Sequence, residues 1–335
     1  MRLESFLLPL AVSAAVVERQ LGGAKVAGIT KLTPEVNPKA TRQVTRFGPL
    51  TVKGKSAGGD SGQQNWIWTI RDGLCRNCTV LKGHVGLANV DGTPVSPNND
   101  VYIHHILTFD TTKKQKSFLS GCASGAAGLG GAKFIGSGED NNNVAVWYTA
   151  RDGKSNNGFH IGSSDSFMMN IDLVSYHANT KQIYLTMDME YLPGLQGADA
   201  RETLLSVTGC GVPSIKISQT GPTNTTSGKY TFTEDGTILG AKGHLHAGGE
   251  KMVMYINGKF ACESKAMYGG AKGENAIDEM SLCTTSGIKV KKGDVMTMTA
   301  EYDVSKHPVR HESHGMGAGM ADIMGMFDLI FAAHS

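Results

Sequence analysis

Residues 240–259 read GAKGHLHAGGEKMVMYINGK, and this stretch decides the fold and opens the question of function. Asn257-Gly258 is a dipeptide typical of two-residue β-hairpin turns, and strand-forming residues flank it on both sides. In an extended strand, residues i and i+2 project from the same face. His244 and His246 are therefore expected side by side, at a spacing that lets one ion contact both imidazoles. The alternative is a pair of solvated strand histidines.

The same strand-and-turn pattern recurs along the chain. Asp91-Gly92 and Asp235-Gly236 are further turn dipeptides, and no long stretch keeps a helical period. Four segments are typical of strands: residues 101–109, 181–192, 251–264 and 294–304. A chain of 335 residues with 40% hydrophobic content is long enough for two cores. We predict an all-β fold of two antiparallel, jelly-roll-like β-sandwich domains packed side by side.

Two segments interrupt the strand pattern. Residues 191–200, YLPGLQGADA, are the best candidate for a linker, so we predict an N-terminal domain at 16–197 and a C-terminal domain at 198–335. Residues 120–143 are rich in Gly, Ala and Asn with few large apolar groups. We predict a long surface loop there.

The first residues predict secretion. MRLESFLLPLAVSAA, residues 1–15, has an early Arg, an apolar run and small residues before a cleavage site, as in a secretory signal peptide. Asn77-Cys78-Thr79 and Asn224-Thr225-Thr226 are glycosylation acceptors. An even number of cysteines in a secreted chain favours disulfides: Cys75, Cys78, Cys122, Cys210, Cys262 and Cys283. The Cys75/Cys78 pair could also be redox-active or bind zinc, but no second C-x-x-C completes a zinc site.

Charge and hydropathy exclude two classes of partner. A net charge of +2, with scattered Lys and Arg, provides no basic surface for nucleic acid. After the first residues, no apolar stretch approaches the ~18 residues of a membrane span. We expect a secreted, extracellular protein without nucleic-acid partners.

Other histidines extend the metal hypothesis. His104-His105 lies inside the strand segment 101–109, where adjacent side chains normally face opposite ways. Both can bind one metal only if the strand twists or bulges there. The alternative is one buried and one exposed histidine. His177 follows another strand and could supply a third nitrogen.

The last residues add thioethers to the imidazoles. Soft sulfur near imidazoles selects copper that cycles through Cu(I), and Met316, Met320, Met324 and Met326 lie in this part of the chain, although methionine is also a core filler. His307, His311 and His314 could form a separate site, but the surrounding glycines favour surface histidines.

These motifs resemble two families. The order of an H-H strand, a single His after a second strand, H-x-H and then Met is similar to the copper type II, ascorbate-dependent monooxygenases of the peptidylglycine hydroxylating and dopamine β-monooxygenase type, with Ile106 in place of a family Met. Over the full length, CTVLKGHVGL, VYIHHILTFD, YLPG, GAKGHLHAGG, SKHP and MGMF resemble secreted fungal relatives of the stress-up-regulated nodulin family.

The first resemblance implies two mononuclear copper sites. His104, His105 and His177 would hold one copper, and His244, His246 and Met324 the other. It implies C–H hydroxylation with O2 and an external reductant such as ascorbate, on a small-molecule or peptide substrate that stays unknown. Lys242 replaces a substrate-binding Arg, and Asp328 replaces a Tyr, so both become candidate substrate contacts and peptide amidation is not expected. The alternative function is a non-catalytic secreted copper-binding or cell-surface stress protein.

Overall fold

The computed structural model describes residues 19–55, 63–95, 101–114, 116–121, 131–138, 144–151, 156–209, 215, 217, 220–269, 277–284, 286–309 and 323–334. All regular elements in these ranges are β-strands, which confirms the predicted all-β fold. Within these ranges, no helix is long and apolar enough to cross a membrane. The predicted signal peptide, 1–15, lies outside the described residues.

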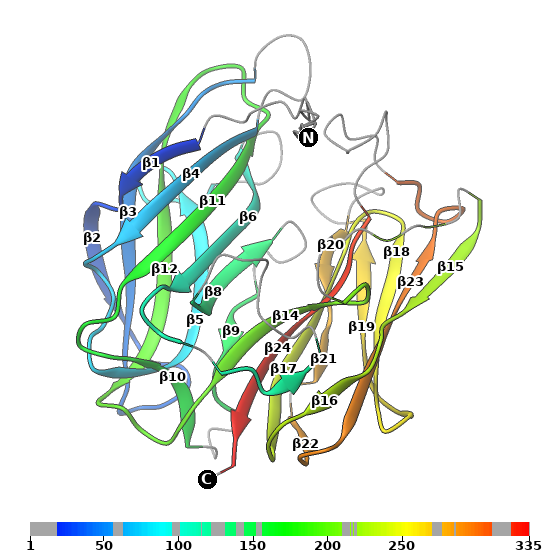
Figure 1. Ribbon diagram of the computed structural model, residues 1–335. Coiled ribbons are helices and arrows are strands. Elements are labelled where there is room, and N and C mark those ends of the chain that lie inside the picture. The colour runs from blue at the N-terminus through cyan, green and yellow to red at the C-terminus, as the bar shows by residue number, and fades with distance from the viewer. Residues whose placement is uncertain are drawn as a thin grey trace, which may run out of the picture.

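One sheet of ten strands, here called the central sheet, runs through both halves of the molecule (Figure 1). Its strand order is β1 (Arg19–Gly23), β4 (Gln63–Ile70), β11 (Phe167–Ser175), β6 (Val101–Asp110), β8 (Ala132–Gly138), β14 (Arg201–Ser206), β24 (Gly325–Ala333), β17 (Gly236–Leu245) and β21 (Leu282–Thr284), with β22 (Ile288–Val290) also on β17. Adjacent strands of the central sheet are antiparallel, except for β1 and β4, which are parallel to each other. The sheet therefore joins elements that the sequence assigns to two domains.

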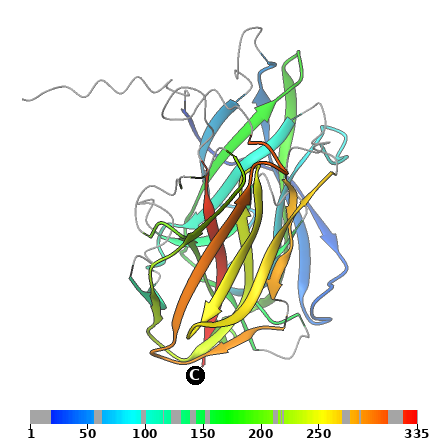
Figure 2. The ribbon, with the colours of Figure 1, turned by 90° about the vertical axis from the view of Figure 1, so that its right-hand side faces the viewer.

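Two sheets of seven strands complete the sandwich. The first outer sheet contains β13 (Ala198–Asp199), β10 (Asn157–Ile161), β5 (Cys78–Ala88), β12 (Lys181–Pro193), β3 (Thr41–Val52) and β2 (Val26–Leu32), with β9 (Val146–Trp147) on β5. The second outer sheet, which faces the viewer in Figure 2, contains β20 (Ile277–Met280), β19 (Lys259–Tyr268), β18 (Gly249–Ile256), β23 (Val295–Asp303), β16 (Tyr230–Phe232) and β7 (Leu119–Ser120), with β15 (Pro222–Thr226) on β23.

Each outer sheet covers its own hydrophobic core. Phe134, Phe159 and Phe167 pack in the first core, and Phe327 and Phe331 pack in the second. The first core also takes up three side chains from β17 and the strand beside it: Leu239, Ile330 and Ala332. The two halves thus share apolar contacts as well as a sheet, and the boundary at residue 198 stays a prediction.

The predicted strands are found with small shifts of their ends. Segments 101–109, 181–192 and 294–304 lie in β6, β12 and β23. Segment 251–264 folds back at Asn257 and Gly258, whose φ angles of 51° and 73° are those of the type I′ turn that joins β18 and β19. Strand β12 extends through Pro193, so pairing reaches into the segment predicted as a linker.

The prediction of a surface loop at 120–143 is wrong for residues 132–138, which form β8 at the middle of the central sheet. Glycine and alanine suggested a loop, but at Gly136 the absence of a side chain allows close contact between strands. A Cβ on Gly136 would lie 2.9 Å from the backbone oxygen of Ile106 on β6. Glycine at position 136 is therefore a requirement of sheet packing.

Two disulfides are present among the described cysteines. Cys75 pairs with Cys78, so these two thiols are not available as zinc ligands. Cys262 of β19 pairs with Cys283 of β21 and so fastens the second outer sheet to the central sheet. Cys122 and Cys210 lie outside the described residues.

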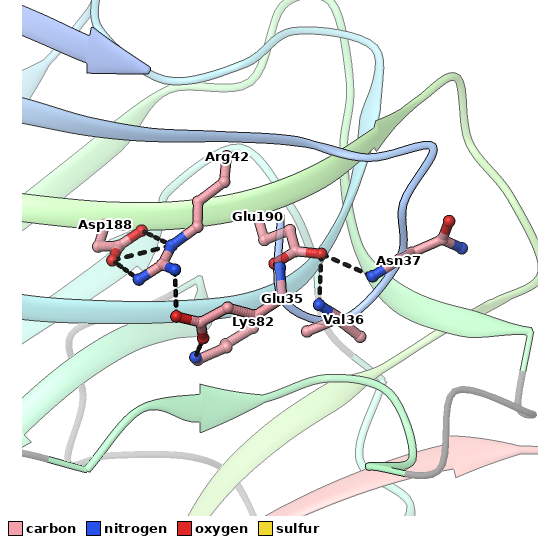
Figure 3. Close-up of polar contacts among 7 residues, drawn as sticks. All are labelled: Glu35, Val36, Asn37, Arg42, Lys82, Asp188 and Glu190. Carbon is pink, nitrogen blue, oxygen red and sulfur yellow. Dashed lines mark hydrogen bonds and ion pairs between the residues drawn. The ribbon is translucent and has the colours of Figure 1, made fainter. Parts of the chain in front are cut away.

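A buried carboxylate anchors the turn that leads into β3 (Figure 3). Glu190 is 1% exposed, and its carboxylate accepts backbone N–H groups of Glu35, Val36 and Asn37 at 2.7, 2.8 and 2.8 Å. Beside it, the Arg42 guanidinium pairs with Asp188 at 2.6 Å. Three amide donors on one carboxylate hold this turn against β12.

Candidate metal centre

One cavity of about 210 Å³ gathers nearly all of the predicted site residues. Strands β6, β8, β14, β17 and β24 of the central sheet contribute to its wall. All but one of the predicted residues line it: His104, His105, Lys242, His244, His246, Met324 and Asp328. The structure thus brings together motifs separated by more than 100 residues of sequence.

Strand β6 carries the first histidine pair at a β-bulge. His105 is opposite Asp172 of β11, whereas Ile103 is opposite Leu173, so His104 is the extra residue. A bulge sends two adjacent side chains toward one side, which is the condition for both imidazoles to bind one metal ion. The two imidazole rings lie with centroids 5.3 Å apart.

Asp172 joins this histidine pair. Its Oδ2 lies 3.4 Å from Nδ1 of His104 and 3.8 Å from Nδ1 of His105. Within the described part of the chain, these three residues form a group whose potential ligand atoms all lie within 4.8 Å of one another. Asp172 was not predicted from the sequence as a site residue. Its only signal was an acidic residue inside the apolar segment FMMNIDLVS.

His177 is not among the residues that line the cavity. It follows the end of β11, and its Nδ1 accepts the backbone N–H of Asn179 at 3.1 Å. Ser175 pairs with Val101, so β11 has already run three residues, or ~10 Å, beyond Asp172 before His177 is reached. The structure does not bring this imidazole to the His104/His105 pair.

The second histidine pair, His244 and His246, lies at the end of strand β17. The two side chains lie near each other, as their two-residue spacing predicts. Lys242 and His244 face the cavity, while Ala241 and Leu245 pack in the second core. His246 follows directly after β17, and its ring centroid lies 5.3 Å from that of His244 at 87°. Met324, just before β24, lines the same cavity.

Tyr302 of β23 ties together the backbone around two of these residues. Its hydroxyl accepts the N–H of His246 at 3.0 Å and donates to the carbonyl oxygen of Met324 at 2.5 Å. The side chain is 1% exposed. One buried hydroxyl therefore fixes the separation between the H-x-H segment and Met324.

The cavity wall continues into a buried charged cluster. The Lys133 ammonium of β8 donates to Glu202 and, at 2.6 Å, to Oδ2 of Asp328. The Tyr148 hydroxyl donates to the other Glu202 oxygen at 2.6 Å. One ammonium thus faces two carboxylates in a largely dry environment. Lys133 was not predicted as a buried or functional residue, because it lies in the segment predicted as a loop.

Burial shapes the electrostatics on both sides of the cavity. Burial, with added repulsion from Glu202, raises the pKa of Asp328 to about 7, although Lys133 opposes the shift. Burial also lowers the pKa of His105; Asp172 opposes this, and nearby His104 and His244 lower it further. Neutral imidazole is the form that binds metal, so this environment favours binding.

The separate His307 cluster is only partly described. The His307 ring stacks on Tyr268 at 3.6 Å and lies 3.8 Å from a Glu250 oxygen. His311 and His314, with Met316 and Met320, lie outside the described residues. His307 has a packing role in the described part of the chain.

Similarity to known proteins provides evidence that is independent of the geometry of the cavity. No protein-family model matches the chain. Among solved structures, the glycosylasparaginase PNGase F of Flavobacterium meningosepticum aligns over 87% of this chain and 96% of that one, with 10% identity and a TM-score of 0.39, which is too low to carry an argument.

Two curated fungal proteins are similar in sequence. Probable copper-dependent oxygenase M1 of Phoma sp. (strain ATCC 20986 / MF5453) is 23% identical over 280 residues, covering 81% of this chain and 68% of that protein. Probable copper-dependent oxygenase clz3 of Cochliobolus lunatus is 24% identical over 222 residues, covering 65% of this chain and 68% of that protein. The chain is thus related, at low identity, to proteins named as copper-dependent oxygenases.

Proposed function

We propose that this chain is a copper-dependent monooxygenase that hydroxylates a C–H bond with O2 and an external one-electron reductant such as ascorbate. The observation that carries the proposal is the shared cavity, which is lined by His104 and His105 from β6 and by His244, His246 and Met324 from the β17–β24 side. The similarity to the two named oxygenases supports the choice of copper.

The donor sets fit copper. Imidazole nitrogen suits copper in both oxidation states, and the thioether of Met324 favours Cu(I). The bulge that directs His104 and His105 to one side has no purpose in sheet pairing, since it interrupts the ladder with β11. Copper would be held at the His104/His105 pair and at His244, His246 and Met324. When bound, it would supply dioxygen activation and one-electron transfer.

The remaining wall residues would hold the substrate. Leu107, Leu204 and Met326 provide apolar surface suited to the C–H portion of a substrate. Lys242 lies opposite Asp328 across β17 and β24 and offers a polar end to the same cavity. We propose Lys242 and Asp328 as contacts that orient a small-molecule or peptide substrate. The two disulfides support the proposed extracellular location.

Copper stoichiometry with oxygen uptake tests the proposal. We expect about two coppers in the full chain and about one in each of His105→Ala and His244→Ala, with ascorbate-dependent oxygen uptake in the unsubstituted chain and in neither variant. His307→Ala is the matched control and should keep both coppers. One copper without oxygen uptake would favour a copper-binding protein, and a metal content unaffected by both cavity substitutions would refute both functions.

Tyr302→Phe should weaken the second site without removing a ligand. Losing the hydroxyl that joins His246 to Met324 is expected to weaken Cu(I) binding there by roughly tenfold, the lower end for supporting residues around metal ligands. A competition titration with a Cu(I) chelator measures this. Tyr230→Phe is a matched control, because Tyr230 is buried in the same core and donates to Ser206. Equal effects of the two substitutions would contradict the positioning role.

A further inference from the structure

We infer that Asp172 supplies the third ligand beside His104 and His105, so that the first metal site contains two imidazoles and one carboxylate. This inference rests on the proposed function and departs from the all-nitrogen site that the sequence resemblance implies. It assigns a ligand on β11, in the strand paired with the histidines, in place of His177 beyond the strand's end.

The distances fit metal ligation better than hydrogen bonding. The separations of 3.4 and 3.8 Å between Asp172 Oδ2 and the two Nδ1 atoms exceed the ~2.7–3.2 Å of N–H···O hydrogen bonds. Two ligand atoms, each ~2.0–2.2 Å from one ion, lie roughly 3.3–3.6 Å apart in a tetrahedral arrangement. The three side chains therefore already have nearly the spacing of atoms that share an ion.

Among the described residues, no other cationic side chain pairs with the Asp172 carboxylate. The Asp172 side chain is 8% exposed, and its ion pairs with described residues are those to the two histidines. Gln63 Nε2 donates to Oδ2 at 2.8 Å, and the buried Oδ1 accepts no hydrogen bond from any described residue. A buried carboxylate with a spare oxygen is costly unless a cation compensates it. Gln63 would orient the carboxylate, as supporting residues around metal ligands do.

The β-bulge gives a structural reason for this ligand set. Because His104 is the inserted residue, both imidazoles of β6 are placed opposite the single residue Asp172. Asp172, His104 and His105 are thus fixed by two paired strands of the central sheet. His177 would have to be supplied by the segment after β11, where its Nδ1 already accepts a backbone N–H.

An anionic oxygen ligand makes the two sites chemically different. Carboxylate is a hard ligand that favours a divalent ion such as Cu(II), whereas the Met324 thioether of the second site favours Cu(I). The first site should therefore hold Cu(II) more tightly relative to Cu(I) than a three-imidazole site would. Replacing Asp172 with His should shift this preference toward Cu(I).

The test isolates the first site in a His244→Ala background and uses Cu(II) alone as the probe. Cu(II) affinity and the nitrogen splitting of the electron paramagnetic resonance spectrum are measured for Asp172→Ala, Asp172→His and His177→Ala. We expect Asp172→Ala to lose more than the ~10–100-fold affinity typical of a supporting residue. Asp172→His should restore binding with one additional nitrogen, and His177→Ala should change neither readout.

Two controls distinguish the loss of a metal ligand from a loss of folding. Thermal unfolding of the apo proteins checks folding, and Asp172→Asn, which keeps the side-chain shape without the charge, replaces any variant that fails to fold. The inference would be overturned if the spectrum of His177→Ala lost the splitting of one nitrogen. It would also be overturned if Asp172→Ala kept the affinity and spectrum of its parent. Either result would leave the copper proposal intact. No Cu(II) binding at all in the His244→Ala background would overturn the two-site proposal as well.

Discussion

Lys133→Met is expected to lower the free energy of unfolding by about 3–5 kcal/mol, the cost of leaving buried carboxylates without their cation. Lys133 and Glu202 are almost completely buried, and the ammonium binds both Glu202 and Asp328. Methionine has nearly the same length, so packing is largely kept while the charge is removed. The midpoint and slope of urea unfolding, with disulfides intact, measure the loss.

A second lysine, Lys251, provides a control that separates the effect of burial from the effect of losing a charge. Lys251 also bridges two carboxylates, Glu263 and Glu301, but its side chain is 32% exposed. Lys251→Met should therefore cost less than about 1 kcal/mol. Adding Asp328→Asn to Lys133→Met should recover part of the loss, because one of the two unpaired charges is removed. If Lys133→Met costs no more than Lys251→Met, the buried cluster does not stabilise the fold as described.

Glu190→Ala removes the only side-chain acceptor described for the amides of Glu35, Val36 and Asn37 and should cost about 3–5 kcal/mol. A hydrogen bond to a charged group contributes ~1.5–3 kcal/mol, and three on one carboxylate are not fully additive. The turn before β3 would lose its attachment to β12. Amide hydrogen exchange at residues 35–37, together with urea unfolding, follows both effects.

Glu190→Gln tests whether charge is needed at this position. The amide keeps one oxygen but turns an N–H₂ donor toward backbone N–H groups, so we expect more than half of the loss seen with alanine. Glu263→Ala is the control at a partly exposed position, since its carboxylate binds only lysine side chains among the described residues. Copper content should stay at the level of the unsubstituted chain, because Glu190 does not line the cavity.

The sequence predicts those parts of the site that depend on local geometry. The two-residue period of strands places His244 and His246 on one face, and the need for a bulge at His104-His105 follows from the same rule. Both features are present. Lys242, two positions before His244, faces the same cavity for the same reason.

Features that depend on strand register over long distances could not be predicted. Asp172 is opposite His105 because β11 pairs with β6, and no pattern within either segment specifies that pairing. Lys133 was not predicted because its segment is rich in glycine, which is typical of loops but at Gly136 is needed for the close contact of β8 with β6. His177 was proposed only from its position after a strand, and the structure places it outside the lining of the cavity that holds the other predicted residues.

The order β14–β24–β17 also constrains biosynthesis. Strand β24 lies between two strands that precede it in the chain, and Phe327, Leu329 and Phe331 from β24 fill the second core. About 120 residues separate the end of β14 from the start of β24, which is roughly 6–24 s of synthesis at ~5–20 residues per second. Throughout that interval the nascent chain exposes one edge of β14, and from the completion of β17 at Leu245 it also exposes one edge of β17. Protection of these edges by a chaperone would therefore matter more for the yield of this protein than for a sandwich assembled from consecutive hairpins.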